Sequence, residues 1–418
     1  MTVSALIPAR LNSSRLEKKL IKDLDGIPII VRTYKNVVST NLFKEVIVVT
    51  DADEIVEILK KHNIKFLKSL KSHNTGTDRI AEFADKFNSD IIVNVQGDEP
   101  FISKDDLISI INEFKCDSNN LVNVVSLMIK LSNIDEINNP NNVKVVVDNN
   151  NDSILFSRSI IPFDRDDLKP NYYKHIGVYA FRALYLKKFA KYDQTPLEKA
   201  EMVEALRIVE HGEKIRMIEI FKEHVSIDTI DDLKMAESIL KKKMIKFIFH
   251  KILGWKINGY SELPVKCVLI AGPHTHWIDL FLGFAIRNSI GEDIKFIGKK
   301  ELFIFPLNIL LRYLGGIPVV RNSKTKTVDQ ISNLIKSKKE FKLAISPEGT
   351  RKKVYKWKSG FYYIAKKSNI PVICISLNFK KRIVTFSKPY FLTSNINKDI
   401  EKLKINFKDS IGKIAEYS

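Results

Sequence analysis

Residues 3–19 read VSALIPARLNSSRLEKK, and this stretch decides the fold of the first half of the chain. Its apolar beginning is typical of a short buried strand. The loop that follows carries four cations, namely Arg10, Arg15, Lys18 and Lys19. Cations at the carboxyl end of a strand suit a polyphosphate, because arginine can donate two parallel hydrogen bonds to it. The loop lacks the glycines of the G-x-x-x-x-G-K-[ST] motif, so it is not a P-loop, and taken alone it could equally be a solvated loop.

Outward from this stretch, short apolar runs alternate with segments of helical spacing. Runs at 45–50 (EVIVVT) and 90–96 (DIIVNVQ) predict further buried strands, and helices are predicted over 29–38, 53–62 and 77–87. Repeated βαβ units predict an α/β fold with a mostly parallel sheet covered on both faces. Ligands of such sheets bind beyond the carboxyl ends of the strands. That rule selects three candidate site segments, which are 9–19, Asp51 and 96–99.

Two aspartates in this half are candidate metal ligands. Asp98 lies in VQGDEP, directly after a predicted strand, and Asp228 lies in SIDTIDDL near residue 230. Carboxylates at a strand end can hold Mg²⁺ against phosphate oxygens. For either aspartate alone, a helix cap is an equally good interpretation. Together they predict a magnesium site.

Charge divides the chain into two bodies. Of the 418 residues, 44% are hydrophobic and 28% charged, which excludes a disordered chain, and the net charge is +19. Residues 1–240 contain 33 Lys or Arg and 37 Asp or Glu, whereas residues 241–418 contain 35 and 12. We therefore expect two domains, 1–240 and 241–418, with different partners. The basic half has no zinc-finger spacing or RNA-binding signature, which favours an anionic membrane surface over nucleic acid.

The second domain begins with KKKMIKFIFHKILGWKI, residues 241–257. On a helical wheel, most of its apolar side chains share one face and its lysines lie opposite, which predicts an amphipathic helix in a membrane interface. The helix is too short and too charged to span a bilayer. A core helix with a solvated lysine face remains the alternative. A second apolar stretch, 302–320, could dip into lipid or belong to the core.

After this helix, the sequence again predicts an α/β domain, with strands at 267–273, 295–298, 317–320, 342–347 and 371–377. The first of these strands leads into PHTHWIDLFLGFAIR, which contains His274 and Asp279. Five residues apart, they cannot share one face of a helix, but they can meet if His274 lies on the entering loop. The carboxylate would then orient the imidazole as a general base. A structural His–Asp pair is the alternative, and we expect His276 to be a surface or capping residue.

A second group of polar residues follows the strand predicted at 342–347. SPEGTR places Glu348, Gly349, Thr350 and Arg351 where amides, a hydroxyl and a guanidinium can converge on a phosphate, and Arg321 after GGIPVV adds a cation.

The three cysteines, Cys116, Cys267 and Cys374, are far apart and lie in apolar runs. We interpret them as buried thiols in a reducing cytosol. The N-terminus lacks the pattern of a secretory signal, so we expect a cytoplasmic protein, peripheral on the inner face of the cytoplasmic membrane.

Eight motifs occur one after another in the first 240 residues. They are IPAR(x4)R, TGTDR, VNVQGDEPFI, NPNNVKVV, FSRSIIPFDR, KHIGVYAFR, PLEKAEMVEALR and IDTIDDL. Together they resemble the 3-deoxy-manno-octulosonate cytidylyltransferase family, also called CMP-Kdo synthetases. The resemblance implies a Rossmann-like sheet of the nucleotide-diphospho-sugar-transferase type. It also implies a reaction of CTP with the lipopolysaccharide sugar acid Kdo that uses Mg²⁺, and a homodimer through this domain.

The resemblance also implies roles for single residues. Arg10, Arg15 and Lys19 would hold the CTP phosphates, Thr77 in TGTDR would belong to the substrate site, and Gln96 would lie near the cytosine. Asp98 and Asp228 would bind Mg²⁺. The sugar pocket would be lined by Arg158, His175, Glu198 and Glu201. The sequence departs from the family where the usual L-P-G-K is replaced by LEKK at 16–19, which places the anion Glu17 beside the phosphates.

In the second domain, H-x4-D, FIGKKELF, GGIPVVR, SPEGTR and IPVICIS resemble the glycerophosphate acyltransferase superfamily, which includes 1-acylglycerol-3-phosphate acyltransferases. The resemblance implies that His274 activates an acceptor hydroxyl with the support of Asp279. Arg321, Glu348, Gly349, Thr350 and Arg351 would bind the acceptor phosphate. Acyl-CoA or acyl carrier protein would donate the acyl chain.

We therefore expect a bifunctional enzyme, a CMP-Kdo synthetase fused to an acyltransferase. Two alternatives stay open. The second domain could be a membrane tether without catalytic activity, or the first domain could activate a different sugar acid. The sequence predicts no nucleic-acid partner for either domain.

Overall fold

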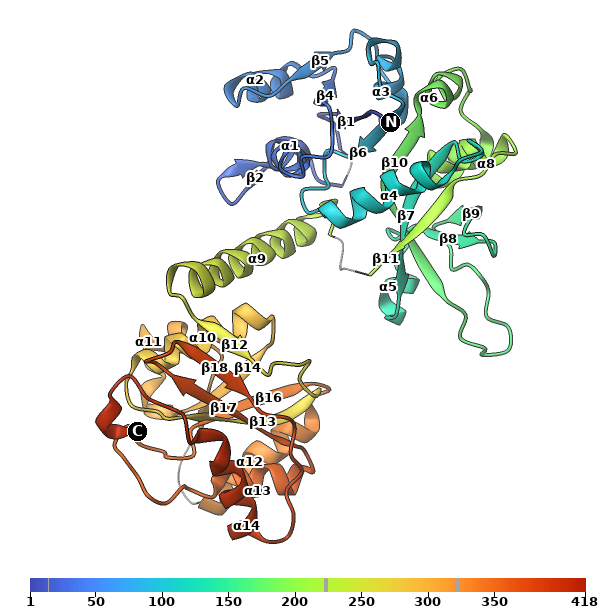
Figure 1. Ribbon diagram of the computed structural model, residues 1–418. Coiled ribbons are helices and arrows are strands. Elements are labelled where there is room, and N and C mark those ends of the chain that lie inside the picture. The colour runs from blue at the N-terminus through green and yellow to red at the C-terminus, as the bar shows by residue number, and fades with distance from the viewer. Residues whose placement is uncertain (14, 222–224, 320–323) are drawn as a thin grey trace. The chain divides into compact units, whose positions relative to one another are not determined.

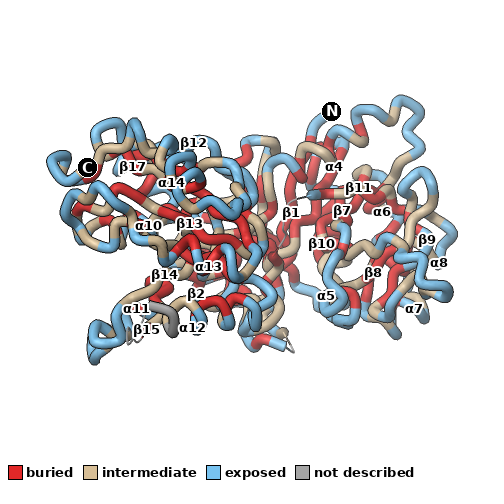
Figure 2. The backbone as a smooth tube through the Cα atoms, turned by 90° about the horizontal axis from the view of Figure 1, so that it is seen from below, coloured by how far each residue is buried: buried red, intermediate tan, exposed pale blue. Residues whose placement is uncertain are grey.

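The computed structural model describes residues 1–418 apart from 14, 222–224 and 320–323. It divides into two compact units, Met1–Glu237 and Ser238–Ser418. The sequence placed the boundary after residue 240. Both units are α/β (Figure 1), as predicted. The buried residues, red in Figure 2, concentrate in the strands of each unit.

The sheet of the first unit has the strand order β11-β7-β10-β6-β1-β4-β5, and a hairpin of β8 and β9 extends it beside β10. Strand β10 is antiparallel to its neighbours β6 and β7, and the other pairs along this order are parallel. The strand bounds are β1 Val3–Ala9, β4 Val46–Thr50, β5 Phe66–Lys68, β6 Ile91–Val95, β7 Val124–Leu131, β8 Lys144–Val147, β9 Ser153–Ser157, β10 Tyr172–Arg182 and β11 Arg216–Ile220.

Helices cover this sheet because their apolar faces match its two surfaces. Helices α3, α6 and α8 share one core cluster with strand residues such as Leu6, Ile92 and Phe181. Helices α1 and α4 contact β1, β4, β7 and β11 but contribute no residue to that cluster. The helix bounds are α1 Ile29–Ser39, α2 Asp53–Lys61, α3 Gly76–Ala81, α4 Lys104–Cys116, α5 Ile134–Asn138, α6 Ala183–Phe189, α7 Pro196–Glu201 and α8 Ala205–Glu210. The helix predicted over 77–87 is therefore too long, because α3 ends at Ala81 and a 3₁₀ turn follows at Ala84–Lys86.

The predicted helix over 241–257 is wrong in its extent. Helix α9 runs without a break over Ile230–Phe247, since no glycine or proline interrupts it, and a π turn continues it over Ile248–Ile252. Gly254 then turns the chain with a φ of 68°. Phe249 and Trp255 from the predicted apolar face are buried in the core of the second unit. This segment is therefore partly a core element, as the alternative interpretation held.

The sheet of the second unit has the order β12-β18-β17-β13-β16-β14-β15, and all its neighbours are parallel except β17 and β18. Alternate residues of its central strand face opposite sides: Val268 and Ile270 pack with α12, α13 and α14, and Cys267 and Leu269 pack with α10. The strand bounds are β12 Lys256–Asn258, β13 Lys266–Gly272, β14 Ile294–Lys299, β15 Gly316–Val319, β16 Phe341–Ile345, β17 Val372–Asn378 and β18 Ile383–Phe386. The helix bounds are α10 Ile278–Ile290, α11 Leu307–Tyr313, α12 Lys324–Ser337, α13 Gly360–Ser368 and α14 Ile396–Lys404.

Two further sequence predictions, on the cysteines and on membrane-spanning helices, can be compared with the structure. Cys267 and Cys374 are buried as expected, but Cys116 is exposed because it ends α4 on the solvent side. Among the described residues, none of the helices is both long and apolar enough to cross a bilayer.

Candidate functional site

A cavity of about 960 Å³ opens in the first unit at the carboxyl ends of β1, β6 and β7. This is the position that the parallel sheet predicts for a ligand. Many of the residues singled out in the sequence line it, namely Arg10, Arg15, Lys19, Gln96, Asp98, Arg158, His175, Glu198 and Asp228. Thr77 and Glu201 are not among its lining residues.

Lys19 holds the two candidate metal ligands together. Its ammonium contacts a carboxylate oxygen of Asp98 and lies 2.7 Å from Oδ1 of Asp228. Arg15 adds a second cation, with Nη2 3.2 Å from Oδ2 of Asp228. Burial favours the neutral amine of Lys19, but the charges of Asp98 and Asp228 outweigh it and raise the pKa of Lys19. Burial likewise opposes ionisation of Asp228, but Lys19 outweighs it and keeps the pKa of Asp228 below its usual value.

The donor set fits Mg²⁺ bound together with a nucleotide. Two carboxylates from separate segments, Asp98 and Asp228, already converge on one cation, the ammonium of Lys19. Within the described part of the chain, no cluster of three or more His, Cys, Asp or Glu side chains could hold a metal by itself. Magnesium commonly takes one or two carboxylates and completes its shell with phosphate oxygens and water. The residues present supply the protein's share of such a site.

One wall of the cavity is held by a buried lysine. Lys144 is fully buried, and its ammonium donates to the carbonyls of Asn139 (3.2 Å), Asn142 (2.8 Å) and Arg158 (2.6 Å). Arg158 in turn donates its backbone N–H to Glu201 at 2.8 Å and its Nε to the Glu201 carbonyl at 2.7 Å. Glu201 therefore orients Arg158 from outside the cavity.

His175 is a packed, neutral residue at the cavity wall. Its ring lies between Phe156 and Tyr179, with centroids 5.0 and 5.3 Å away, and Nε2 is 3.1 Å from the hydroxyl of Ser126. Burial lowers the pKa of His175 to about 3. It stays uncharged near neutral pH and can contribute a neutral donor or acceptor.

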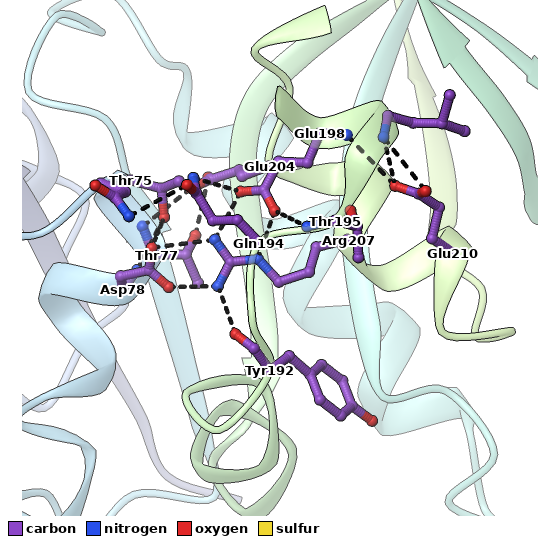
Figure 3. Close-up of polar contacts among 12 residues, drawn as sticks. Thr75, Thr77, Asp78, Tyr192, Gln194, Thr195, Glu198, Glu204, Arg207 and Glu210 are labelled. Atoms are coloured by element: carbon purple, nitrogen blue, oxygen red, sulfur yellow. Dashed lines mark hydrogen bonds and ion pairs between the residues drawn. The ribbon is translucent and has the colours of Figure 1, made fainter. Parts of the chain in front are cut away.

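Glu198 belongs to a buried ion-pair network (Figure 3). Arg207 Nη2 lies 2.6 Å from Oε1 of Glu198, and Arg207 Nη1 lies 2.6 Å from Oδ1 of Asp78. Beside it, the hydroxyl of Thr77 donates to Glu204 at 2.8 Å. The network fastens the TGTDR segment to α7 and α8 (Figure 3). Thr77 and Glu198 therefore have structural partners that the sequence did not reveal.

Sequence reasoning gave no role to several charged residues of the cavity, although one of them, Glu99, lies in the candidate segment 96–99. Lys174 and Glu99 both line the cavity. Burial, and next the charge of Asp98, hold the pKa of Glu99 well above its usual value. The sequence offered one indication of both residues, because each is next to a candidate site residue. Glu99 follows Asp98 in VQGDEP, and Lys174 precedes His175 in KHIGVYAFR.

The second unit carries the candidate site around His274 and Asp279. His274 lies on the loop after β13, and Asp279 lies in the first turn of α10. His274 Nδ1 is 3.0 Å from Oδ2 of Asp279, and the same oxygen accepts the backbone N–H groups of Thr275 and His276, each at 2.9 Å. His276 Nδ1 instead accepts the N–H of Ile278 at 3.2 Å, so its ring has a capping contact.

The SPEGTR segment approaches the same loop. Oε2 of Glu348 accepts the backbone N–H of His274 at 2.8 Å, and burial raises the pKa of Glu348. Gly349 has a φ of 64°, and a Cβ there would lie 2.6 Å from the side chain of Lys358. Arg351 is exposed and Thr350 half-buried. Arg321 lies outside the described residues.

The fold and the cavity of the first unit together define a nucleotidyltransferase, with cations and paired carboxylates beyond the ends of parallel strands. Residues 4–215 match the model of the cytidylyltransferase family. The 3-deoxy-manno-octulosonate cytidylyltransferase of Flavobacterium johnsoniae is 45% identical over 242 residues, which are 58% of this chain and 99% of the relative. That of Christiangramia forsetii is 43% identical over 239 residues, 57% of this chain and 96% of the relative. Through its first unit, the chain belongs to the 3-deoxy-manno-octulosonate cytidylyltransferase family.

A solved structure agrees with this assignment. A CMP:2-keto-3-deoxy-manno-octonic acid synthetase complexed with CTP matches with a TM-score of 0.55 and 32% identity, covering 58% of this chain and all of that one. Residues 255–378 match the model of the acyltransferase family. Both resemblances seen in the sequence are thus confirmed.

Proposed function

We propose that the first unit joins CTP and Kdo to give CMP-Kdo and diphosphate. The observation that carries this proposal is the convergence of Lys19, Asp98 and Asp228 in a large cavity, in a chain whose relatives are named for this reaction. The anomeric hydroxyl oxygen of Kdo attacks the α-phosphorus of CTP. The bond from that phosphorus to the bridging oxygen breaks, diphosphate leaves, and the hydroxyl proton passes to solvent.

Positioning and charge neutralisation carry most of the catalysis in such a transfer. Arg10, Arg15 and Lys19 bind the triphosphate, and Gln96 lies by the cytosine. Arg158, held by Glu201 and Lys144, binds the Kdo carboxylate. Asp98 and Asp228 would hold Mg²⁺, which would neutralise charge on the phosphates. Lys19, which contacts both carboxylates in the structure, would then bind a phosphate.

Diphosphate release from CTP tests this function directly. We expect release to require both Kdo and Mg²⁺, and Lys19→Met to lower the rate by at least about a hundredfold, as expected when a transition-state cation is lost. Lys18→Met is the matched control. It removes a neighbouring lysine that pairs with Glu54 and does not line the cavity. Preference for another sugar acid over Kdo would support the alternative cytidylyltransferase.

We further propose that the second unit transfers an acyl group from a thioester, either acyl-CoA or acyl carrier protein, to a phosphate-bearing acceptor. The contact of His274 with Asp279 supports this. His274 Nε2 takes the proton of the acceptor hydroxyl as its oxygen attacks the thioester carbonyl. The C–S bond then breaks, and the thiolate takes up the proton from His274. Glu348 holds the His274 loop, and Thr350 and Arg351 bind the acceptor phosphate.

The tether alternative differs in one measurable outcome. Wild-type protein should transfer acyl groups to 1-acylglycerol-3-phosphate or to another acceptor in a panel of phosphate-bearing alcohols. His274→Ala should lower this rate by at least about a hundredfold, the lower range for loss of a general base, and His276→Ala should cost far less. A wild-type chain that acylates no member of the panel but still binds anionic vesicles would be a tether.

A further inference from the structure

One segment of the second unit exposes an unusual number of large apolar side chains. Within 302–313, seven of the twelve residues are exposed and apolar or aromatic, and Phe305 reaches 80% and Ile309 62% exposure. Soluble proteins leave such side chains exposed singly, and a contiguous group marks an interaction surface. The sequence left open whether 302–320 belongs to the core or contacts lipid. Most residues of 302–313 are exposed and lie outside the core, whereas Gly316–Val319 forms strand β15 of the sheet.

The exposed residues belong to an ordered segment with fixed inward contacts. Phe303 fills the space above two glycines on adjacent strands, because a Cβ on Gly298 or Gly316 would lie within 3.0 Å of its ring. Leu311 and Leu314 are buried at the end of α11. Arg287 of α10 donates to the carbonyl of Leu314 at 3.0 Å. The remaining apolar side chains therefore face outward while the backbone is held in place.

The exposed surface continues onto α10 beside the candidate acyltransferase site. The rings of Tyr313 and Phe284 lie 5.6 Å apart, which joins the two helices. Trp277, which caps the start of α10, and Phe281 on α10 are both exposed, with ring centroids 5.7 Å apart. Trp277 is only three residues from His274. We call Trp277, Phe281 and the exposed apolar residues of 302–313 the α10–α11 face.

The charged residues next to the α10–α11 face indicate the kind of partner that this face binds. Lys299, Lys300 and Arg312 are exposed within or next to the segment, where Glu301 is the opposing charge. The second domain as a whole carries 35 Lys or Arg and 12 Asp or Glu over 241–418. Tryptophan and tyrosine with flanking cations are typical of surfaces that lie in the interface of an anionic bilayer. A twelve-residue segment is too short to span that bilayer.

We propose that the α10–α11 face inserts into the surface of an anionic membrane and brings His274 to the level of the lipid headgroups. This deepens the acyl-transfer function and rests on it for the role of His274, but not for membrane binding itself. The proposal also places the membrane contact outside 241–257, where Phe249 and Trp255 are buried although Met244, Phe247 and Ile252 are exposed. Side chains of such surfaces enter the bilayer by about 5–10 Å.

Vesicle binding by the full chain tests the proposal. Phe305→Ser with Ile309→Ser should lower the partition into vesicles of equal phosphatidylcholine and phosphatidylglycerol at least about tenfold, since burial of one large apolar side chain accounts for that much. Phe391→Ser with Ile405→Ser is the matched control. Phe391 and Ile405 are 61% and 59% exposed and follow β18 and α14, and α14 packs on the face of the sheet opposite α10. Their substitution should change partition by less than about threefold.

Trp277 provides a direct probe of depth. Its emission should shift to shorter wavelength on vesicle addition and be quenched by brominated acyl chains, and Trp277→Phe should remove most of both signals. Trp255 is only 7% exposed and is not expected to respond. Circular dichroism and thermal unfolding report whether each variant remains folded, and CMP-Kdo synthesis should not change because the substituted residues lie in the second unit.

Other outcomes overturn the proposal in distinguishable ways. If Met244→Ser with Ile252→Ser abolishes vesicle binding and the Phe305/Ile309 variant does not, the 241–257 segment is the membrane contact. If the Phe305/Ile309 variant changes the oligomeric state without changing vesicle binding, the face joins two copies of the chain. If vesicle binding follows the proposal but wild-type protein acylates no acceptor, the acyl-transfer function fails and the membrane face stands.

Discussion

Replacing Asp279 by Asn separates the charge of this carboxylate from its geometry. Oδ2 accepts three hydrogen bonds, from His274 Nδ1 and from the N–H groups of Thr275 and His276. Oδ1 is buried, and among the described residues it has no hydrogen-bond partner. The amide oxygen of Asn can replace Oδ2, which leaves its NH₂ group in the Oδ1 position. The imidazole thus keeps its tautomer and orientation and loses only the negative charge beside it.

The expected loss of rate follows from that charge. Two unit charges about 4 Å apart interact by roughly 4 kcal/mol at an effective dielectric constant of about 20. The side chain of His274 is 29% exposed, so water weakens the interaction. We therefore expect about 2–3 kcal/mol of lost transition-state stabilisation, which is roughly a 30- to 150-fold slower acyl transfer. The buried NH₂ group should also cost about 1–3 kcal/mol of stability in the second unit.

The assay compares initial rates of acyl transfer by wild type and Asp279→Asn with the acceptor that wild type uses best. CMP-Kdo synthesis by the same samples is the internal control and should not change. Asp279→Ala, which removes all three hydrogen bonds, should lose more activity than Asp279→Asn. A rate for Asp279→Asn within about threefold of wild type would refute the role of the charge, because a change that small is below 1 kcal/mol.

Three further predictions concern the first unit. Asp98→Asn should slow Mg²⁺-dependent diphosphate release at least about a hundredfold and leave acyl transfer intact; a variant that keeps most of its Mg²⁺-dependent rate would remove Asp98 from the metal site. Lys144→Met should raise the KM for Kdo about tenfold with little effect on the KM for CTP, because it frees the carbonyl of Arg158; equal effects on both substrates would contradict a role in the sugar wall. Arg207→Met should destabilise the unit by about 3–5 kcal/mol in urea, because Glu198 would be buried without its partner. Burial opposes ionisation of Asp78, but Arg207 outweighs it and lowers the pKa of Asp78 below 3.8. The stabilisation from the ion pair of Asp78 with Arg207 is therefore complete above pH 3.8 and is lost as the pH falls through the lowered pKa. Wild type should therefore lose stability in acid more steeply than the variant.

The strands were predictable because β-branched runs bounded by polar loops leave little choice of structure. The location of Arg10, Lys19 and Asp98 at the cavity was predictable because parallel sheets bind ligands at the edge where their strands end. The continuous helix α9 was missed because the change from a mixed-charge to a lysine-rich sequence was interpreted as a structural boundary. Composition changes there, but no residue breaks the helix.

Contacts between residues distant in sequence could not be predicted. Glu198 and Arg207 are close in the chain, but the contact of Arg207 with Asp78 crosses 129 residues. Likewise, the Glu348 carboxylate was expected at a phosphate, and its contact with the backbone of His274 spans 74 residues. Long-range pairs of this kind leave no periodic pattern, so only the folded structure reveals them.

The departure from the family motif at LEKK shows what that loop requires. A glycine is usual at the position of Lys18, which in this chain has φ 50° and ψ 36° and so keeps a left-handed backbone. Such a conformation costs a lysine about 1–2 kcal/mol. The lysine side chain contacts Glu54 at 2.8 Å, and neither Lys18 nor Glu17 lines the cavity, which corrects the expectation of an anion beside the phosphates. This left-handed residue, Lys18, whose backbone a glycine would adopt without that cost, immediately precedes Lys19, which contacts Asp98 and Asp228.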